Sequence, residues 1–187
     1  YASYKIQQLD PNANIIVAPS DHIILKEDEF ERITKRAFDF VSKNDALCTL
    51  GILPTRPDTG YGYIQYHEDI ADDEVYKVKT FTEKPNKETA EQFIESGDFL
   101  WNAGIFIWNV KNIISAFENY LHEVSDAFSD VIQYFNSDKE HLAIDKAFAE
   151  CPNISIDFGI MEKAENVYVL PADLGWSDLG TWASLYA

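Results

Sequence analysis

The sequence NIIVAPSDHIILKEDEFERITKRAFDFVSKNDALCTLGI occupies residues 14–52 and contains two apolar runs with an amphipathic segment between them. The runs, at residues 14–18 and 46–52, do not alternate polar with apolar residues, which is typical of strands buried on both faces of a parallel sheet. Residues 28–43 are expected to form a helix because apolar side chains recur there at helical spacing, at Phe30, Ile33, Ala37, Phe38 and Val41. This strand–helix–strand unit predicts a right-handed crossover between parallel strands and hence an α/β fold.

Further strands and helices are predicted outward from this unit. A helix is expected to end at residue 9, before the unit. After it, strands are expected at residues 61–66, 74–81, 99–110 and 167–170, and helices at 87–96, 111–134, 139–149 and 155–164. The alternation predicts a mixed central sheet flanked by helices. Sheets of this type usually begin with a strand, a Gly-rich turn and a helix, so we expect a βαβ unit upstream of residue 1 in a longer protein.

Composition and charge exclude several classes of protein. A chain of 187 residues with 46% hydrophobic residues suits one domain. Its net charge of −17 argues against nucleic acid and anionic membranes as partners, because both need basic patches. No apolar run is long enough to span a membrane, and no signal peptide is visible. Cys48 and Cys151 follow no metal or redox spacing, so a cytoplasmic location is expected.

Two aspartates occupy settings that suit a metal ion. Residues 175–182 read GWSDLGTW, with Asp178 between two glycines and two tryptophans, and Asp21 follows the first apolar run in the motif PSDH. Ligands of open α/β sheets bind outside the carboxyl ends of strands, and Mg²⁺ prefers one or two carboxylates with substrate oxygens and waters. Asp21 and Asp178 are therefore candidate Mg²⁺ ligands; a capped turn is the alternative for each. His22 is interpreted as a structural or supporting residue, because Mg²⁺ disfavours imidazole.

Two further motifs suit a sugar phosphate. In TGYGYI, at residues 59–64, Tyr61 and Gly62 leave bare backbone beside a ring against which a sugar or a base could lie; a β-bulge or a crowded strand crossing is the alternative. In FTEKP, at residues 81–85, Glu83 can accept hydrogen bonds from sugar hydroxyls and Lys84 is a point charge suited to a phosphate. Taken alone, these five residues favour an exposed ion pair before a helix.

The remaining motifs add polar groups without adding a nucleophile. WNAGIF, at residues 101–106, places the amide of Asn102 beside the small residue Gly104, and an amide can both donate to and accept from a hydroxyl. SIDFGIMEK, at residues 155–163, adds the carboxylate of Asp157, for which a helix cap is the alternative. No GxSxG, HExxH or zinc-binding spacing is present, which favours metal-assisted displacement at phosphorus over covalent catalysis.

Together and in this order, these motifs resemble those of the nucleotidyltransferases that make nucleotide sugars, and within them the mannose-1-phosphate guanylyltransferases, or GDP-mannose pyrophosphorylases. The matching pieces span almost the whole chain: PSDH, GILPT with TGYGYI, FTEKP, WNAGIF, SIDFGIMEK and GWSDLGTW. The resemblance implies a Rossmann-like nucleotidyltransferase fold. It also implies an enzyme that converts GTP and mannose 1-phosphate to GDP-mannose and pyrophosphate, with Mg²⁺ as cofactor.

The resemblance also assigns roles to residues. Asp21 and Asp178 would hold the metal and, with Lys84 on the sugar phosphate, form the catalytic set. The substrate-binding set that it implies is Tyr61, Gly62, Glu83, Lys84, Asn102, Gly104 and Asp157.

The chain departs from the family pattern at its beginning. The Gly-rich signature that ends in an Arg, with a later Lys, does not occur in residues 1–187. We therefore expect residues 1–187 to be a partial catalytic domain, the sugar-phosphate and metal half without the first βαβ unit or a second domain, and to be inactive or nearly so by themselves. Two alternatives stay open: a pyrophosphorylase for glucose 1-phosphate with dTTP or UTP, and a non-catalytic regulatory subunit that binds a sugar phosphate. Separately, the sheet edge left by the missing unit could form a homodimer.

Overall fold

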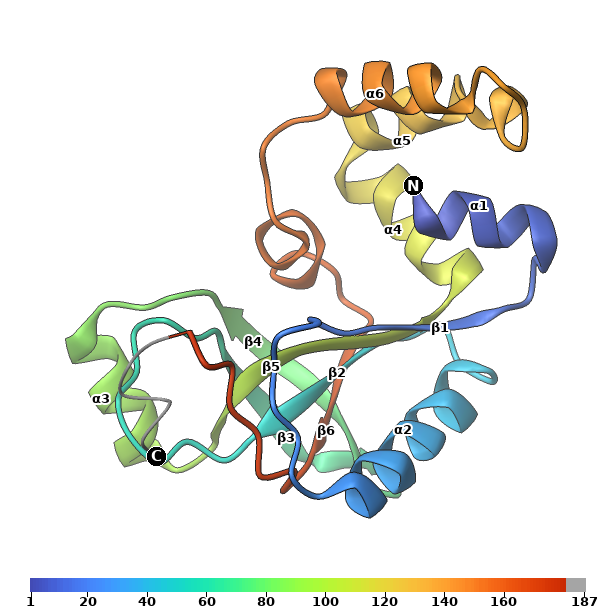
Figure 1. Ribbon diagram of the computed structural model, residues 1–187. Coiled ribbons are helices and arrows are strands. Elements are labelled where there is room, and N and C mark those ends of the chain that lie inside the picture. Colours follow the sequence, from blue (N-terminus) through green and yellow to red (C-terminus); the bar gives the residue numbers. More distant parts are fainter. Residues whose placement is uncertain (181–187) are drawn as a thin grey trace.

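In the computed structural model of the chain, residues 1–180 are described, apart from the side chains of residues 70 and 71. Within this part, six strands form one mixed sheet in the order β1-β5-β2-β6-β4-β3 (Figure 1). The strands are β1 (Asn14–Val17), β2 (Leu47–Ile52), β3 (Tyr63–Asp72), β4 (Val75–Thr82), β5 (Phe99–Asn109) and β6 (Val167–Pro171). β2 and β6 pair in parallel, and the other neighbours pair antiparallel. The expected mixed central sheet is confirmed.

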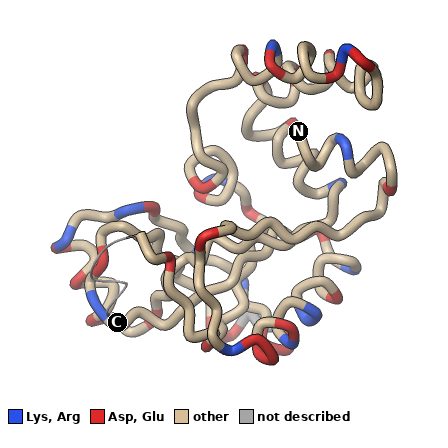
Figure 2. The backbone as a smooth tube through the Cα atoms, in the orientation of Figure 1, with Lys and Arg blue, Asp and Glu red and all other residues tan. Residues whose placement is uncertain are grey.

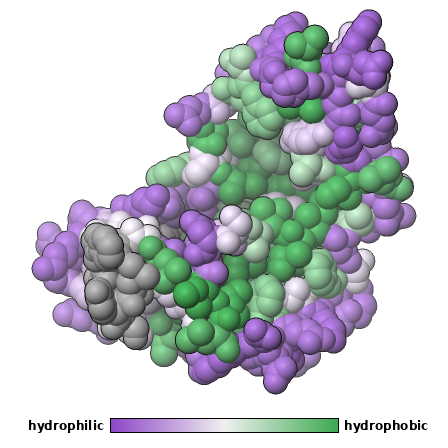
Figure 3. All heavy atoms as spheres, viewed as in Figure 1, coloured by the Kyte–Doolittle hydropathy of each residue, from purple (hydrophilic) through white to green (hydrophobic). Residues whose placement is uncertain are grey.

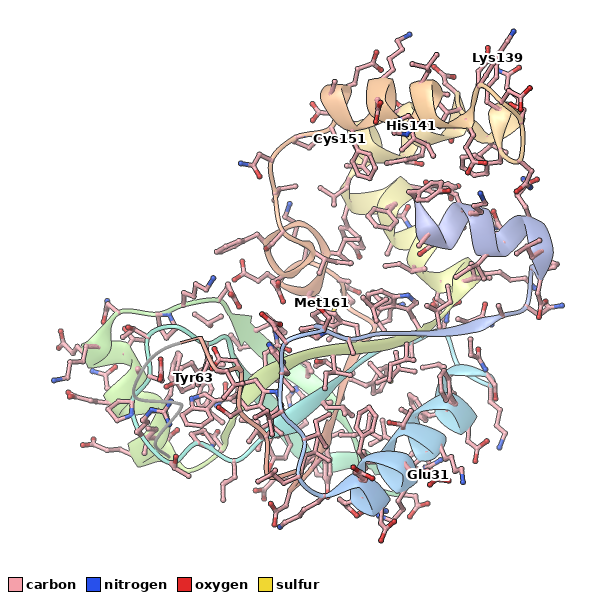
Figure 4. All side chains as sticks on the ribbon, in the orientation of Figure 1. Glu31, Tyr63, Lys139, His141, Cys151 and Met161 are labelled. Atoms are coloured by element: carbon pink, nitrogen blue, oxygen red, sulfur yellow. The ribbon has the colours of Figure 1, made fainter. Side chains whose placement is uncertain are left out.

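Helices cover the sheet and form a separate cluster at one end of it (Figure 1). They are α1 (Ala2–Leu9), α2 (Glu27–Val41), α3 (Lys87–Ser96), α4 (Val110–Tyr120), α5 (His122–Ser129) and α6 (Glu140–Glu150), with a 3₁₀ turn at Ile132–Tyr134 and a π-helix at Asp157–Met161. α2 buries Ile33, Ala37 and Val41 against one face of the sheet. The π-helix buries Ile160 and Met161 against the other face, where Figure 4 labels Met161.

The first strand–helix–strand unit differs from its prediction. β1 and β2 both run antiparallel to β5, so they point the same way, but β5 lies between them. β1 is therefore the last strand of the described sheet, and Val17 is 45% exposed. The expectation that residues 14–18 are buried on both faces is wrong, whereas residues 47–50 are fully buried as expected. The eleven-residue β5 causes the difference, because it pairs along its length with β1, β2 and β3.

The helix expected at residues 111–134 is interrupted. α4 ends at Tyr120, and Leu121 leaves the helical region with φ −136° and ψ 60° before α5 begins. Leu121 packs against Gly159 so closely that a Cβ on that glycine would lie 2.7 Å from Leu121 Cδ1. The chain changes direction there, and the apolar residues expected in one helix contribute to two hydrophobic cores. One core lies against the sheet, and the other lies within the helical cluster of α1, α4, α5 and α6. The helix expected at residues 155–164 is the shorter π-helix.

The helical cluster lies away from the strand ends that carry the sequence motifs. Figure 4 places His141 and Cys151 in this cluster, far from the sheet, which leaves both outside any site built on the strands. Charged residues gather on helices and loops, while the strands are mostly uncharged (Figure 2). Among the described helices, none has both the length and the apolar character that crossing a membrane requires.

Gly51 is a test of how tightly the sheet packs. A Cβ at this position would lie 2.6 Å from Leu100 Cδ1 and 2.7 Å from Val169 Cγ2, in the middle of the sheet. We expect Gly51→Ala to lower the free energy of unfolding by about 1–3 kcal/mol in urea titrations, because overpacking displaces core side chains. Gly60→Ala is the control, since its Cβ would meet only the flexible Asp58 carboxylate, at 3.1 Å. Equal losses in the two variants would contradict the packing argument.

Candidate active site

The site is built around Tyr61 and Gly62, which immediately precede β3. Lys84 N–H donates to the Tyr61 carbonyl at 3.2 Å, and Asn102 N–H donates to the Gly62 carbonyl at 2.8 Å. These bonds place the end of β4 on one side of the dipeptide and the middle of β5 on the other. The structure thereby brings together the TGYGYI, FTEKP and WNAGIF motifs, which are far apart in the sequence.

Glu83, Asn102 and Asp157 form a polar cluster on one side of this dipeptide. Asn102 Nδ2 donates to Asp157 Oδ1 at 3.0 Å, while its Oδ1 accepts from the Thr49 hydroxyl at 2.9 Å and from Gly104 N–H at 3.2 Å. The amide is therefore held in one orientation by partners on separate elements. Because Asn102 and Asp157 come from β5 and the π-helix, their contact also joins the sheet to the segment packed over it.

Glu83 points into the space that Gly62 leaves empty. A Cβ on Gly62 would collide with Glu83 Oε2 and would lie 3.3 Å from Asn102 Cβ. The crowded crossing that the sequence left open is thus present, with a carboxylate as the neighbour. Glu83 Oε2 is buried without a hydrogen-bond partner in the described chain, although the side chain keeps 10% of its exposure. A buried acceptor of this kind is suited to a donor hydroxyl from a ligand.

Burial shapes the electrostatics of the polar cluster. Desolvation raises the pKa of Glu83, and the nearby charge of Asp157 raises it further, whereas Lys84 opposes the shift. Desolvation likewise raises the pKa of Asp157, against the hydrogen bond from Asn102 and the charge of Lys84. A ligand that donates hydrogen bonds to these two carboxyl groups would stabilise their ionised forms.

Lys84 lies at the solvent-exposed edge of the polar cluster. Its Nζ lies 3.6 Å from Glu83 Oε1 and its side chain is 62% exposed, so it is accessible to an anion. Its backbone adopts φ +48°, which is uncommon for a residue with a side chain. The flanking Glu83 N–H donates to Glu162 Oε1 at 3.0 Å, so the second carboxylate of SIDFGIMEK fixes the turn that carries Lys84.

Tyr61, Trp101 and Trp176 form an aromatic frame on the other side of the dipeptide. The Tyr61 ring meets Trp101 at 4.9 Å and Trp176 at 5.2 Å between centroids, both edge-on. The Tyr61 hydroxyl donates to Asp178 Oδ1 at 2.8 Å, so it faces a carboxylate. Burial raises the pKa of Tyr61, and the bond to Asp178 raises it further, which keeps the hydroxyl protonated.

A short antiparallel bridge joins the segments that carry Asp21 and Asp178. Ile23 N–H donates to the Ser177 carbonyl at 2.8 Å and Ser177 N–H donates back to the Ile23 carbonyl at 3.1 Å. The two aspartates, 157 positions apart in the numbering, thus lie on paired backbones. His22 accepts a hydrogen bond at Nδ1 from Trp176 Nε1 at 3.1 Å, which suits the supporting role expected for it.

Gly104 connects the polar cluster to the PSDH motif. Its φ of +67° belongs to an irregular step of β5, where three residues lie opposite one residue of β2. A Cβ at Gly104 would lie 3.8 Å from Pro19 Cγ and 4.0 Å from His22 Cε1. Gly104 therefore lies beside Pro19 and His22 of the motif that contains Asp21, and the remaining candidate residues are linked through the Tyr61–Gly62 dipeptide and its neighbours.

A cavity of about 920 Å³ borders the aromatic frame. Its walls are mainly apolar and include Ile52, Leu53 and Leu174, with Tyr61, Trp101 and Trp176 contributing rings. Asn102 does not line it although Trp101 does, because successive strand residues point to opposite faces. Ile23 and Leu25, which also line the cavity, are each more than a third exposed. Figure 3 shows hydrophobic residues gathered on the face of the molecule that it draws.

Asp178 leaves one carboxylate oxygen open to a divalent cation. Asp178 Oδ1 accepts from Tyr61 and from Gly180 N–H at 3.1 Å, whereas no hydrogen bond in residues 1–180 reaches Oδ2. Asp21 is exposed, and within the same residues no ion pair engages it. No group of three or more His, Cys, Asp or Glu suited to a metal occurs in the described chain, so further ligands would come from substrate and water, as is usual for Mg²⁺.

Sequence reasoning did not assign a role to Arg56. Its guanidinium donates to Asp58 Oδ2 and, at 3.4 Å, to the Tyr61 hydroxyl, and it lies 5.2 Å from the Trp101 centroid. The sequence signal that could have identified Arg56 is its position between two prolines, shortly before the TGYGYI motif. Thr49 was also missed, because a threonine inside an apolar strand gives no hint of its bond to Asn102.

The mixed sheet and the order of the motifs along it are those expected of a nucleotidyltransferase, and comparison with known proteins shows this class. Residues 2–187 match the family model described as nucleotidyl transferase, so the chain belongs to that family. More particularly, it is similar to the mannose-1-phosphate guanylyltransferases. It is 35% identical over 191 residues to one from Escherichia coli, which covers 99% of this chain and 41% of that protein. The resemblance drawn from the motifs is confirmed.

Two further relatives extend this similarity. The chain is 36% identical over 173 residues to mannose-1-phosphate guanylyltransferase RfbM of Salmonella typhimurium, covering 92% of this chain and 36% of that protein. A solved structure described as a mannose-1-phosphate geranyltransferase from Thermus thermophilus superposes with a TM-score of 0.85 at 27% identity, over 98% of this chain and 51% of that one. The chain thus spans about two fifths of the length of the curated relatives that it matches.

The buried Glu83 carboxylate predicts a pH-dependent stability. A folded-state pKa above the unfolded value means that stability is fully present below the unfolded pKa and is lost as pH rises through the folded pKa. We expect Glu83→Gln to raise the free energy of unfolding at pH 7, because the amide has no charge to desolvate. The gain should vanish below about pH 4.3, the unfolded pKa of Glu. Urea titrations at both pH values measure it, and a gain of equal size at both would contradict the argument.

Proposed function

We propose that the protein transfers a guanylyl group from GTP to mannose 1-phosphate, forming GDP-mannose and releasing pyrophosphate. The observation that carries the proposal is the packing of Glu83 and Asn102 around Gly62, with Lys84 bonded through its backbone to the adjacent Tyr61. Asp21 and Asp178 lie on segments joined by the Ile23–Ser177 bridge, in a chain 35% identical to a guanylyltransferase over 99% of its length. This arrangement supports a site with residues of the right chemistry for a sugar, a phosphate and a divalent cation.

In this proposal the polar cluster binds the sugar. Glu83 Oε2, which has no partner in the described chain, accepts from a sugar hydroxyl, and Asp157 and Asn102 offer the next acceptor and donor. Because Gly62 has no side chain, the sugar can approach Glu83 over the backbone at this position. Gly104 serves the same end by shaping the irregular step of β5 next to Asn102.

The phosphate chemistry falls to Lys84 and the two aspartates. Lys84 binds the sugar phosphate and offsets its charge. Asp21 and Asp178 would hold Mg²⁺, which when bound neutralises charge that develops on the nucleotide phosphates. A phosphate oxygen of mannose 1-phosphate attacks the α-phosphorus of GTP in line, a new P–O bond forms, and the bond from the α-phosphorus to the bridging oxygen breaks to release pyrophosphate. Catalysis therefore consists of positioning and charge neutralisation, without a protein nucleophile.

Asp178→Asn tests the proposal in the full-length protein. We expect pyrophosphate release from GTP and mannose 1-phosphate to fall by at least about a hundredfold, because charge stabilisation by a held metal is worth several kcal/mol, while the unfolding transition is retained. Asp173→Asn is the matched control: this carboxylate is nearby in sequence but is exposed and pairs with Lys26.

Substrate comparison completes the test. Turnover of glucose 1-phosphate with UTP or dTTP, and none of mannose 1-phosphate with GTP, would overturn the proposed substrates. Calorimetric binding of the sugar phosphate without any turnover would instead identify a regulatory subunit. Retained activity in Asp178→Asn would refute the metal role of that residue.

A further inference from the structure

The Tyr61 hydroxyl connects the loop of residues 54–60 to Asp178. It donates to Asp178 Oδ1 at 2.8 Å, and Arg56 Nη2 donates to the same hydroxyl oxygen at 3.4 Å. A guanidinium can only donate, and a phenol has a single proton. Because Arg56 donates to the hydroxyl oxygen, the hydroxyl proton is free to donate to Asp178. The two contacts together fix the orientation of the hydroxyl group.

The position of this hydroxyl is set by packed rings. Tyr61 is 8% exposed and packs edge-on against Trp101 and Trp176. Arg56 is itself fixed, because Asp58 Oδ2 accepts from its Nε at 3.0 Å and from its Nη2 at 2.9 Å. The hydroxyl is therefore held by ring packing on one side and by an ion-paired arginine on the other.

The hydrogen bonds on Asp178 are distributed unevenly between its two oxygens. Tyr61 and Gly180 N–H both donate to Oδ1, and in residues 1–180 no donor reaches Oδ2. A Cβ on Gly180 would lie 2.8 Å from Oδ2, so the glycine keeps this oxygen open. The carboxylate is thus anchored by one oxygen and presents the other.

We propose that Tyr61 is a positioning residue that orients Asp178 so that Oδ2 faces a divalent cation. The inference rests on the proposed function, in which Asp178 holds that cation. It gives Tyr61 a role different from the sugar contact that the resemblance implied. Hydrogen-bond partners that orient a metal-binding side chain typically account for about 10–100-fold in metal affinity, so the hydroxyl has a measurable effect separable from the ring.

Mn²⁺ binding to the full-length protein without substrates tests the proposal. Tyr61→Phe removes the hydroxyl and keeps the ring packing, and we expect the Mn²⁺ Kd, measured by water-proton relaxation, to rise about tenfold or more. Tyr63→Phe is the matched control. Its hydroxyl donates to the Asp58 carbonyl at 2.9 Å in the same loop, without contacting Asp178, and its Kd should equal that of the unmodified protein.

The outcomes separate this inference from the proposed function. If Asp178→Asn abolishes Mn²⁺ binding while Tyr61→Phe binds as tightly as the unmodified protein, Tyr61 does not position the ligand, and the proposed function stands. If Tyr61→Phe only lowers the free energy of unfolding, with Kd unchanged, its role is structural and the proposal is overturned. If Asp178→Asn binds Mn²⁺ unchanged, the metal role of Asp178 fails and the inference fails with it.

Discussion

The pairing of β5 with three other strands is the constraint on which the rest of the structure depends. β5 is buried along nearly all its length and pairs with β1, β2 and β3. Its register sets Asn102 opposite Gly51 and Trp101 opposite both Ile52 and Tyr63. The amide of the polar cluster and the indole of the aromatic frame are therefore placed by sheet hydrogen bonding, and the loops that carry Tyr61 and Lys84 dock onto positions already fixed.

Local periodicity predicts a helix at residues 28–43 and a strand at 46–52, close to the observed Glu27–Val41 and Leu47–Ile52, because each signal lies within one element. It could not predict that β5 separates β1 from β2, since strand order depends on contacts between distant segments. The break at Leu121 was equally hidden, because the apolar spacing continues through it while the partner changes from the sheet to the helical cluster.

The candidate site shows the same division. The setting of Asp178 between glycines and tryptophans points to a ligand-binding carboxylate, and the order of the motifs, through the family resemblance, points to Glu83 and Asn102. The contacts that give these residues their properties were not readable: Glu83 fills the space beside Gly62, and Tyr61 reaches Asp178 across 117 positions of sequence. Such contacts arise from the turn geometry of separate strands, which no single stretch of sequence encodes.

The alternation of Trp101 and Asn102 along β5 restricts which insertions and deletions this strand can accept. One of these neighbours lines the apolar cavity, and the other joins the polar cluster on the opposite side of the sheet. Inserting or deleting one residue before them in β5 would exchange their faces, placing an indole among carboxylates and an amide in an apolar wall. Evolution can substitute residues along this strand, but it can add or remove them only in pairs or in the loops beyond its ends.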